Sequence, residues 1–121
     1  AVKDDPKIAI TYWYLGILEA ESGNFPAASK NIKQALERGY VPQSEGEYLF
    51  AADILKENKD YGLVKDFYEK VLVNRPSDQA LMLKLSEVSM LLGDKIRAVE
   101  FAERAALYDA KALETAKSWL K

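Results

Sequence analysis

The stretch from Tyr12 to Ala35 most constrains what this chain can fold into, because it has the pattern of two helices joined by a tight turn. Its first half is densely apolar, and steps of three and four residues place Tyr12, Leu15 and Leu18 or Glu19 on one face of an α-helix. The sequence Ser22-Gly23-Asn24 then ends that helix with residues that favour turns. The helical period resumes in the second half, with Ala28, Ile32 and Ala35 on one side. The stretch therefore predicts a helical hairpin.

Small side chains mark the place where the two predicted helices meet. Gly16 lies inside the first helical pattern, where a glycine costs about 1 kcal/mol relative to alanine. An interior glycine that persists there usually has a packing reason. Together with Ala28, Gly16 predicts a close contact between two antiparallel helices.

The same pattern returns twice along the chain. Asp60 follows Asn24 by 36 residues, and Asp94 follows Asp60 by 34 residues. Each of the three is placed to cap a second helix by accepting backbone N–H bonds. The second copy repeats the apolar stripes with Tyr48, Ala51, Ala52, Leu55, Val64, Tyr68 and Val71. The third copy does so with Met82, Leu85, Ser86, Ser89, Ala98, Ala102 and Ala105.

Cap and turn residues set the expected helix boundaries. Ser44 with Glu47 fits a capping box, Ser77 is placed to cap a fifth helix, and Gly39 followed by Pro42 makes a break. The pattern predicts helices at about 6–22, 25–38, 44–58, 60–74, 78–92 and 95–107, and a seventh helical segment at 109–121. Since no strand pattern lies between them, the predicted fold class is all-α.

A period near 34 residues with helix-turn-helix content resembles the tetratricopeptide repeat family, and the resemblance covers about nine tenths of the chain. It implies a right-handed superhelical α-solenoid of antiparallel helix pairs, with about seven helices in a single domain, 1–121. The repeats would span about 9–42, 45–78 and 79–108, and segment 109–121 would cap the stack or open a truncated fourth repeat. The copies are degenerate, because only the first keeps the glycine and only the second keeps the terminal proline, Pro76.

Composition and the absent residue types bound the function. The net charge is −2 and the pI is near 5.2, so nothing favours nucleic acid or an anionic membrane as a partner. The chain has no His and no Cys, which removes imidazole and thiolate chemistry and the commonest zinc ligands. No Gly-rich phosphate loop is present either. We therefore expect no enzyme activity, no metal and no cofactor.

The sequence leaves the compartment undetermined. The longest uncharged run, Ile8 to Leu18, is far shorter than the ~20 residues of a membrane-spanning helix. No secretory signal is visible, so direct membrane insertion is not expected. The chain opens at Ala1 without an initiator Met, and we expect it to be a piece of a longer protein.

The family resemblance also implies a binding site. In tetratricopeptide proteins the first helices of successive repeats line a concave groove, and here its residues would be Trp13, Tyr14, Ile17, Leu49, Phe50, Asp53, Glu57, Leu83, Glu87 and Met90. Because Tyr12 and Leu15 are expected to face the core, Trp13 is expected to show the largest apolar surface to the groove. The alternative is that Trp13 packs against an upstream helix or a second copy of the chain.

Aromatic anchors beside acids suit a protein or peptide partner that carries apolar and basic side chains. Asp53 and Glu57 lie four residues apart, so with Glu87 they form either a functional acid pair or a solvated charged face. Some tetratricopeptide proteins clamp an acidic C-terminal tail, but acids at the matching positions would repel one. The alternative function is structural: a self-associating assembly domain, or a soluble extension of a larger envelope or membrane protein.

Overall fold

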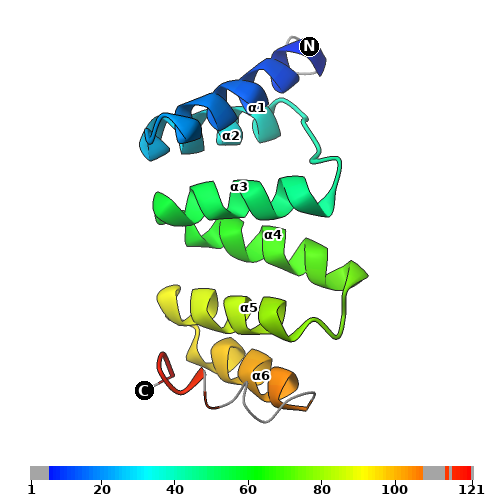
Figure 1. Ribbon diagram of the computed structural model, residues 1–121, viewed down its shortest axis with the longest axis vertical. Coiled ribbons are helices and arrows are strands. Elements are labelled where there is room, and N and C mark those ends of the chain that lie inside the picture. The colour runs from blue at the N-terminus through cyan, green and yellow to red at the C-terminus, as the bar shows by residue number, and fades with distance from the viewer. Residues whose placement is uncertain (1–5, 108–113, 115, 121) are drawn as a thin grey trace. The chain divides into compact units, whose positions relative to one another are not determined.

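The computed structural model describes residues 6–107, 114 and 116–120, and this part of the chain confirms the all-α class (Figure 1). It forms six helices and no strand within those residues. The helices are α1 (Pro6–Glu21), α2 (Phe25–Glu37), α3 (Glu45–Glu57), α4 (Tyr61–Asn74), α5 (Gln79–Leu91) and α6 (Lys95–Ala106). Each begins and ends within one or two residues of its prediction. The predicted seventh segment, 109–121, falls mostly outside the described residues.

Polar caps fix where the helices begin. The Asn24 side chain accepts a bond from Ala27 N at 3.3 Å, and the Asp94 side chain accepts one from Arg97 N at 3.1 Å, so two of the three caps predicted for second helices are confirmed. The third is wrong, because the Asp60 carboxylate bonds to side chains and not to the first turn of α4. The predicted cap of α5 is wrong by one residue. Asp78, not Ser77, accepts the bond from Leu81 N at 3.1 Å, and its charge also suits the positive end of the helix dipole.

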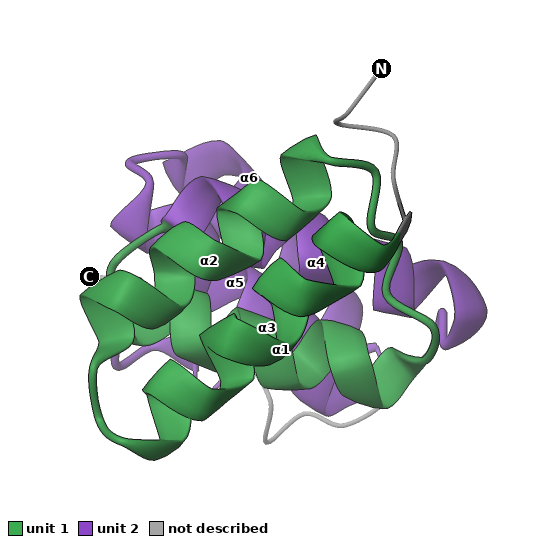
Figure 2. Cartoon of the chain, turned by 90° about the horizontal axis from the view of Figure 1, so that it is seen from above, with its two compact units in different colours: residues 1–60 green, residues 61–121 purple. Residues whose placement is uncertain are grey.

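The chain divides into two compact units, residues 1–60 with α1 to α3 and residues 61–121 with α4 to α6 (Figure 2). In the first unit, α2 packs against both α1 and α3. In the second unit, α5 packs against both α4 and α6. Neighbouring helices in the sequence are therefore neighbours in space within each unit.

The closest helix contact in the first unit is at Gly16, as predicted. A Cβ atom at this position would lie 2.7 Å from Ile32 Cγ1 and 3.0 Å from the carbonyl oxygen of Ala28. Ala28 and Ile32 are themselves fully buried in the contact. The backbones of α1 and α2 approach so closely that no side chain fits between them here.

Our prediction of which face of α1 is buried is wrong. Leu15 and Leu18 are 41% and 58% exposed, whereas Ala9, Trp13 and Gly16 are buried. The core face is turned by about one residue, or 100° around the helix, from the expected stripe. The reason is that α2 approaches at Gly16, and Ala9 and Trp13 lie on the same side of the helix as Gly16.

A partly buried polar cluster ties the end of α3 to α2. The Asp60 carboxylate accepts hydrogen bonds from the buried Ser29 hydroxyl, from Lys33 Nζ at 2.6 Å and from Asn58 Nδ2 at 2.8 Å. Burial by itself raises the pKa of Asp60, but the bonds from Lys33, Ser29 and Asn58 outweigh it and hold this pKa below its ordinary value. The cluster therefore favours the charged form of Asp60.

In the second unit, Ser86 on α5 links two other segments. Its hydroxyl donates to the Ala98 carbonyl on α6 at 2.7 Å, and it accepts a bond from Trp119 Nε1 at 3.0 Å. Arg97 on α6 also pairs with Glu69 on α4 at 3.2 Å. Trp119, near the C-terminus, is thereby held against α5.

Replacing Gly16 tests the helix contact. We expect Gly16→Ala to lower the free energy of unfolding by about 1–3 kcal/mol, because the added methyl group overpacks the contact with Ile32. Urea denaturation followed by circular dichroism measures the change. Gly62→Ala is the control, since Gly62 is an exposed helical residue with no neighbour within 4 Å of an added Cβ. That change should be neutral or stabilising, and an equal loss in both variants would contradict the close contact.

Asp60→Asn tests the polar cluster through pH. Because the folded pKa of Asp60 is lowered, its stabilising contribution is present above the unfolded value, near 3.8, and is lost as pH falls through the folded value. We expect Asp60→Asn to lower the free energy of unfolding at neutral pH by about 1–3 kcal/mol. The difference from wild type should shrink below about pH 4.

Urea titrations at neutral and acid pH give both values. Asp66→Asn is the matched control, because Asp66 is an exposed carboxylate on α4 and should contribute little at either pH. A gap between wild type and Asp60→Asn that stays constant as the pH falls would show that the Asp60 charge does not stabilise the fold.

Candidate functional site

Three neighbouring clefts lie in the first unit, with volumes of about 680, 450 and 280 Å³. The first and second share Tyr14 and Glu47 in their walls, and the second and third share Glu21 and Phe50. They therefore adjoin one another in a row, which we name the α1–α3 groove. Its main side chains are Ile10, Tyr14, Ile17 and Glu21 from α1 and Phe50, Asp53 and Glu57 from α3.

Helical spacing explains why these side chains meet. The α1 residues recur at steps of four, three and four along the helix, so they form one stripe beside the buried Trp13 face. The α3 residues Phe50, Asp53 and Glu57 follow at steps of three and four, beside the buried Ala51 and Ile54. The two stripes become the walls of the groove.

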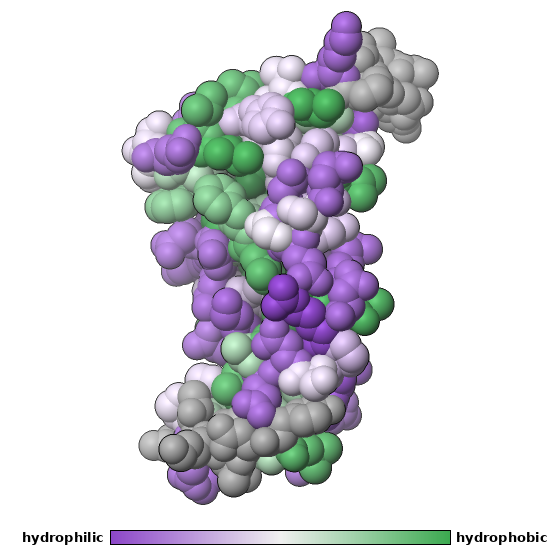
Figure 3. Space-filling model, turned by 45° about the vertical axis from the view of Figure 1, so that its right-hand side comes forward, coloured by the Kyte–Doolittle hydropathy of each residue, from purple (hydrophilic) through white to green (hydrophobic). Residues whose placement is uncertain are grey.

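The groove exposes large apolar side chains. Tyr14 is 58% exposed, Phe50 48% and Ile10 40%. Figure 3 shows apolar side chains gathered over the part of the surface that belongs to the first unit. Exposed aromatic residues that gather in a depression are typical of a binding surface rather than of scattered surface residues.

Carboxylates line the same groove. Glu21, Asp53 and Glu57 are exposed, and no basic residue lines the second or third cleft. None of the three carboxylates is paired with a basic side chain in the described part of the chain. This end of the groove therefore has a negative charge that the described part of the chain leaves uncompensated.

Trp13 lines the second cleft but is almost completely buried, so the prediction that it shows the largest apolar surface to the groove is wrong. Its side chain is 1% exposed, and its ring stacks on Tyr40 with the ring centroids 4.5 Å apart and an angle of 24° between the planes. The physical reason is the rotation of α1 described above, which turns Trp13 inward. The group that covers it is Tyr40 of the same chain, not an upstream helix or a second copy.

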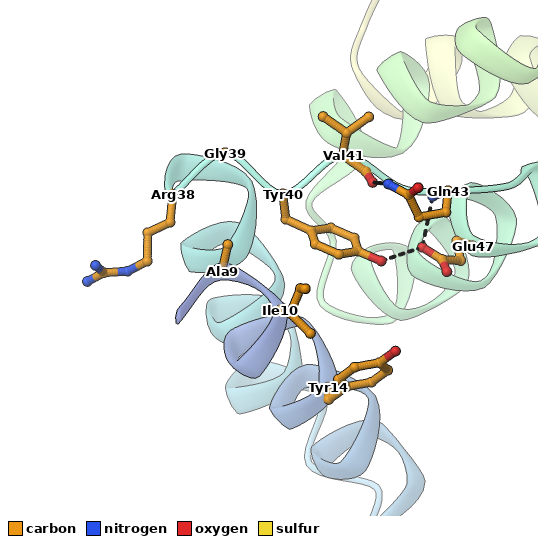
Figure 4. A pocket seen from close by; sticks show the side chains of 9 residues that line it. All are labelled: Ala9, Ile10, Tyr14, Arg38, Gly39, Tyr40, Val41, Gln43 and Glu47. Carbon is orange, nitrogen blue, oxygen red and sulfur yellow. Dashed lines mark hydrogen bonds between the residues drawn. The ribbon is translucent and has the colours of Figure 1, made fainter. Parts of the chain in front are cut away.

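Tyr40 and Glu47 were missed as site residues. The Tyr40 hydroxyl donates to Glu47 Oε1 at 2.7 Å, and the Gln43 backbone N–H donates to the same oxygen at 3.0 Å (Figure 4). Burial raises the pKa of Tyr40, and the hydrogen bond to Glu47 and the charge of Glu47 raise it further, so Tyr40 stays protonated.

The predicted capping box at the start of α3 is confirmed in one half only. Ser44 Oγ accepts a bond from Glu47 N at 3.2 Å, but the Glu47 side chain accepts from the backbone N–H of Gln43 and not from that of Ser44.

The structure brings six of the ten predicted site residues together in the groove: Tyr14, Ile17, Phe50, Asp53, Glu57 and the almost fully buried Trp13. Leu49 is half-buried on α3. The other three, Leu83, Glu87 and Met90, are half-buried on α5 and belong to the second unit.

The groove offers noncovalent chemistry: aromatic and aliphatic surface beside fixed negative charge. The described residues contain no group of three or more acids that could hold a metal ion. No helix in the described ranges combines the length and apolarity needed to cross a membrane.

A scan against models of known protein families finds no match, and a search of curated proteins finds no similar sequence. Function must therefore be inferred from the chemistry of the groove.

Proposed function

We propose that this chain is a non-enzymatic protein-interaction module that holds a peptide or helix segment in the α1–α3 groove. The observation that carries the proposal is the exposure of Tyr14 and Phe50 beside three unpaired carboxylates. Large aromatic side chains in a concave surface are the usual anchors of protein interfaces. Here they come from two helices of one packed unit, so the anchors have a fixed spacing.

The chemistry of the walls indicates the partner. Apolar side chains of the partner would cover Tyr14, Ile17 and Phe50, and Lys or Arg side chains would face Asp53 and Glu57. Opposite charges across an interface favour the correct partner and speed association. An acidic segment would meet repulsion along the same groove.

We also propose that the chain is a tetratricopeptide-like right-handed α-solenoid. The helix pairs, the caps Asn24 and Asp94 and the close approach at Gly16 support this interpretation. Under it, Leu83, Glu87 and Met90 on α5 would line the corresponding helix face of the second unit. Fold resemblance alone does not select a ligand, so the test concerns the groove residues.

Selection from a random peptide library displayed on phage tests the binding proposal. We expect selected peptides to be rich in apolar residues and Lys or Arg, and to bind Phe50→Ala at least about tenfold more weakly than wild type, because truncation removes an aromatic anchor. The double variant Asp53→Asn, Glu57→Gln should weaken binding and reduce its dependence on salt. Fluorescence anisotropy of labelled peptides measures each Kd.

Ile96→Ala is the matched control for Phe50→Ala. Ile96 is 74% exposed on α6, so its truncation removes apolar surface outside the α1–α3 groove. Peptides that lose as much affinity for Ile96→Ala as for Phe50→Ala would point to nonspecific apolar binding. Selection of acidic peptides would refute the proposed charge complementarity.

A second candidate function, self-assembly, is favoured by a different observation. Leu15 and Leu18 are exposed on α1 and line none of the three clefts of the groove. An apolar helix face of this kind suits a second copy of the chain, as in stacks of helical repeats that join end to end.

Sedimentation analysis across a range of protein concentrations tests self-assembly. We expect the mean mass to rise with concentration in the wild type and to stay at the monomer value in the double variant Leu15→Gln, Leu18→Gln, because the apolar contact is lost. Ile10→Gln on the groove side of α1 is the control. A wild type that stays monomeric at all concentrations would rule out assembly through this face.

A further inference from the structure

We propose that the first cleft of the groove is an organic-cation site that takes the ammonium or guanidinium group of a Lys or Arg side chain. This inference rests on the proposed function, because it assigns the place of one basic residue of the bound segment. The site consists of the Glu47 carboxylate, the rings of Tyr14 and Tyr40, and the aliphatic side chains of Ile10 and Val41 (Figure 4). We name it the Glu47 cleft.

The Glu47 carboxylate is held in place by bonds to only one of its two oxygens. Glu47 Oε1 accepts two hydrogen bonds, from the Tyr40 hydroxyl and from the Gln43 backbone, which fix the orientation of the group. No described residue donates a hydrogen bond to the second oxygen, Oε2. Because Oε2 is also not sealed from solvent, it can accept a bond from a ligand. A charged donor would form a stronger bond there than a neutral one.

Aromatic and aliphatic surfaces complete a site for a cation on an apolar stem. The Tyr40 ring is held by its stacking on Trp13, and the Tyr14 ring, 58% exposed, lies beside Ile10 at the same opening. A cation near the face of an aromatic ring is attracted by the ring's quadrupole. Val41 is 60% exposed and offers contact for the methylene groups of the stem.

The basic residue that lines this cleft does not neutralise Glu47. The Arg38 guanidinium carbon lies 4.8 Å from the centroid of the Tyr12 ring. In Figure 4 the Arg38 side chain extends away from Tyr40 and Glu47. The Arg38 guanidinium therefore lies against Tyr12, and the Glu47 cleft stays open to a cation from a ligand.

Size and position fit a side chain of the bound segment. The cleft volume, about 680 Å³, lies in the range of roughly 300–1,000 Å³ usual for organic ligands. It joins the second cleft through Tyr14 and Glu47, so a segment that lies along Phe50 can extend a basic side chain into it. One basic residue of the partner would thus bind beyond the aromatic anchors.

Titration of the full chain with n-butylammonium or n-butylguanidinium tests the site without any peptide. We expect saturable shifts of the Tyr14 and Tyr40 ring resonances in NMR spectra, and no such shifts with n-butanol, which has the same stem without the charge. Glu47→Gln keeps a hydrogen-bond acceptor for Tyr40 and Gln43 but removes the charge, and should weaken cation binding at least about tenfold. Glu103→Gln, which removes an exposed charge on α6, should leave it unchanged.

A second variant covers the case in which Glu47→Gln fails to fold. Tyr14→Leu keeps apolar bulk at an exposed position, and it should weaken cation binding while the helical circular dichroism stays intact. Equal shifts with n-butanol, equal losses in Glu47→Gln and Glu103→Gln, or no Glu47-dependent shift would overturn the site. Groove peptides that depend on Phe50 but tolerate Glu47→Gln would overturn it too, and would leave the proposed function intact.

Discussion

The close approach of α1 to α2 at Gly16 determines most of what the first unit presents to its surroundings. Since no side chain fits between the backbones there, α1 turns its Gly16 face toward α2. This orientation buries Ala9 and Trp13 and places Tyr14 and Glu21 in the groove. The composition of the groove thus depends on Gly16, a residue without a side chain that does not itself line the groove.

Polar contacts at the two ends of α3 hold this helix in place as the second wall of the groove. Glu47, in the first turn of α3, bonds to Tyr40 and Gln43 in the segment before that helix, while Asp60, just after α3, bonds to Ser29 and Lys33 of α2. Polar contacts at both ends therefore fix α3 relative to its neighbours. The apolar middle of the helix is left to pack its buried face and to expose Phe50 and Asp53.

Sequence patterns predicted the helices well but the faces less well. The turn residues and the caps Asn24 and Asp94 act locally, so the sequence reveals where the helices begin and end. The rotation of α1 depends on which neighbour approaches Gly16, and a stripe of apolar residues on a helix that is apolar nearly all round does not reveal that. Tyr40 was missed because its role comes from stacking on Trp13, which is distant in sequence, and from a bond to Glu47 in the next helix, and not from its local pattern.

The stack of Tyr40 on Trp13 has a consequence for the thermodynamics of binding. A segment between helices normally loses conformational freedom when a ligand orders it, and that loss subtracts from the affinity. Here the segment that walls the first cleft is already immobilised by an aromatic stack and by the bonds to Glu47. The entropy of ordering this wall is therefore lost during folding, and a ligand of the proposed site would meet a surface that is already formed.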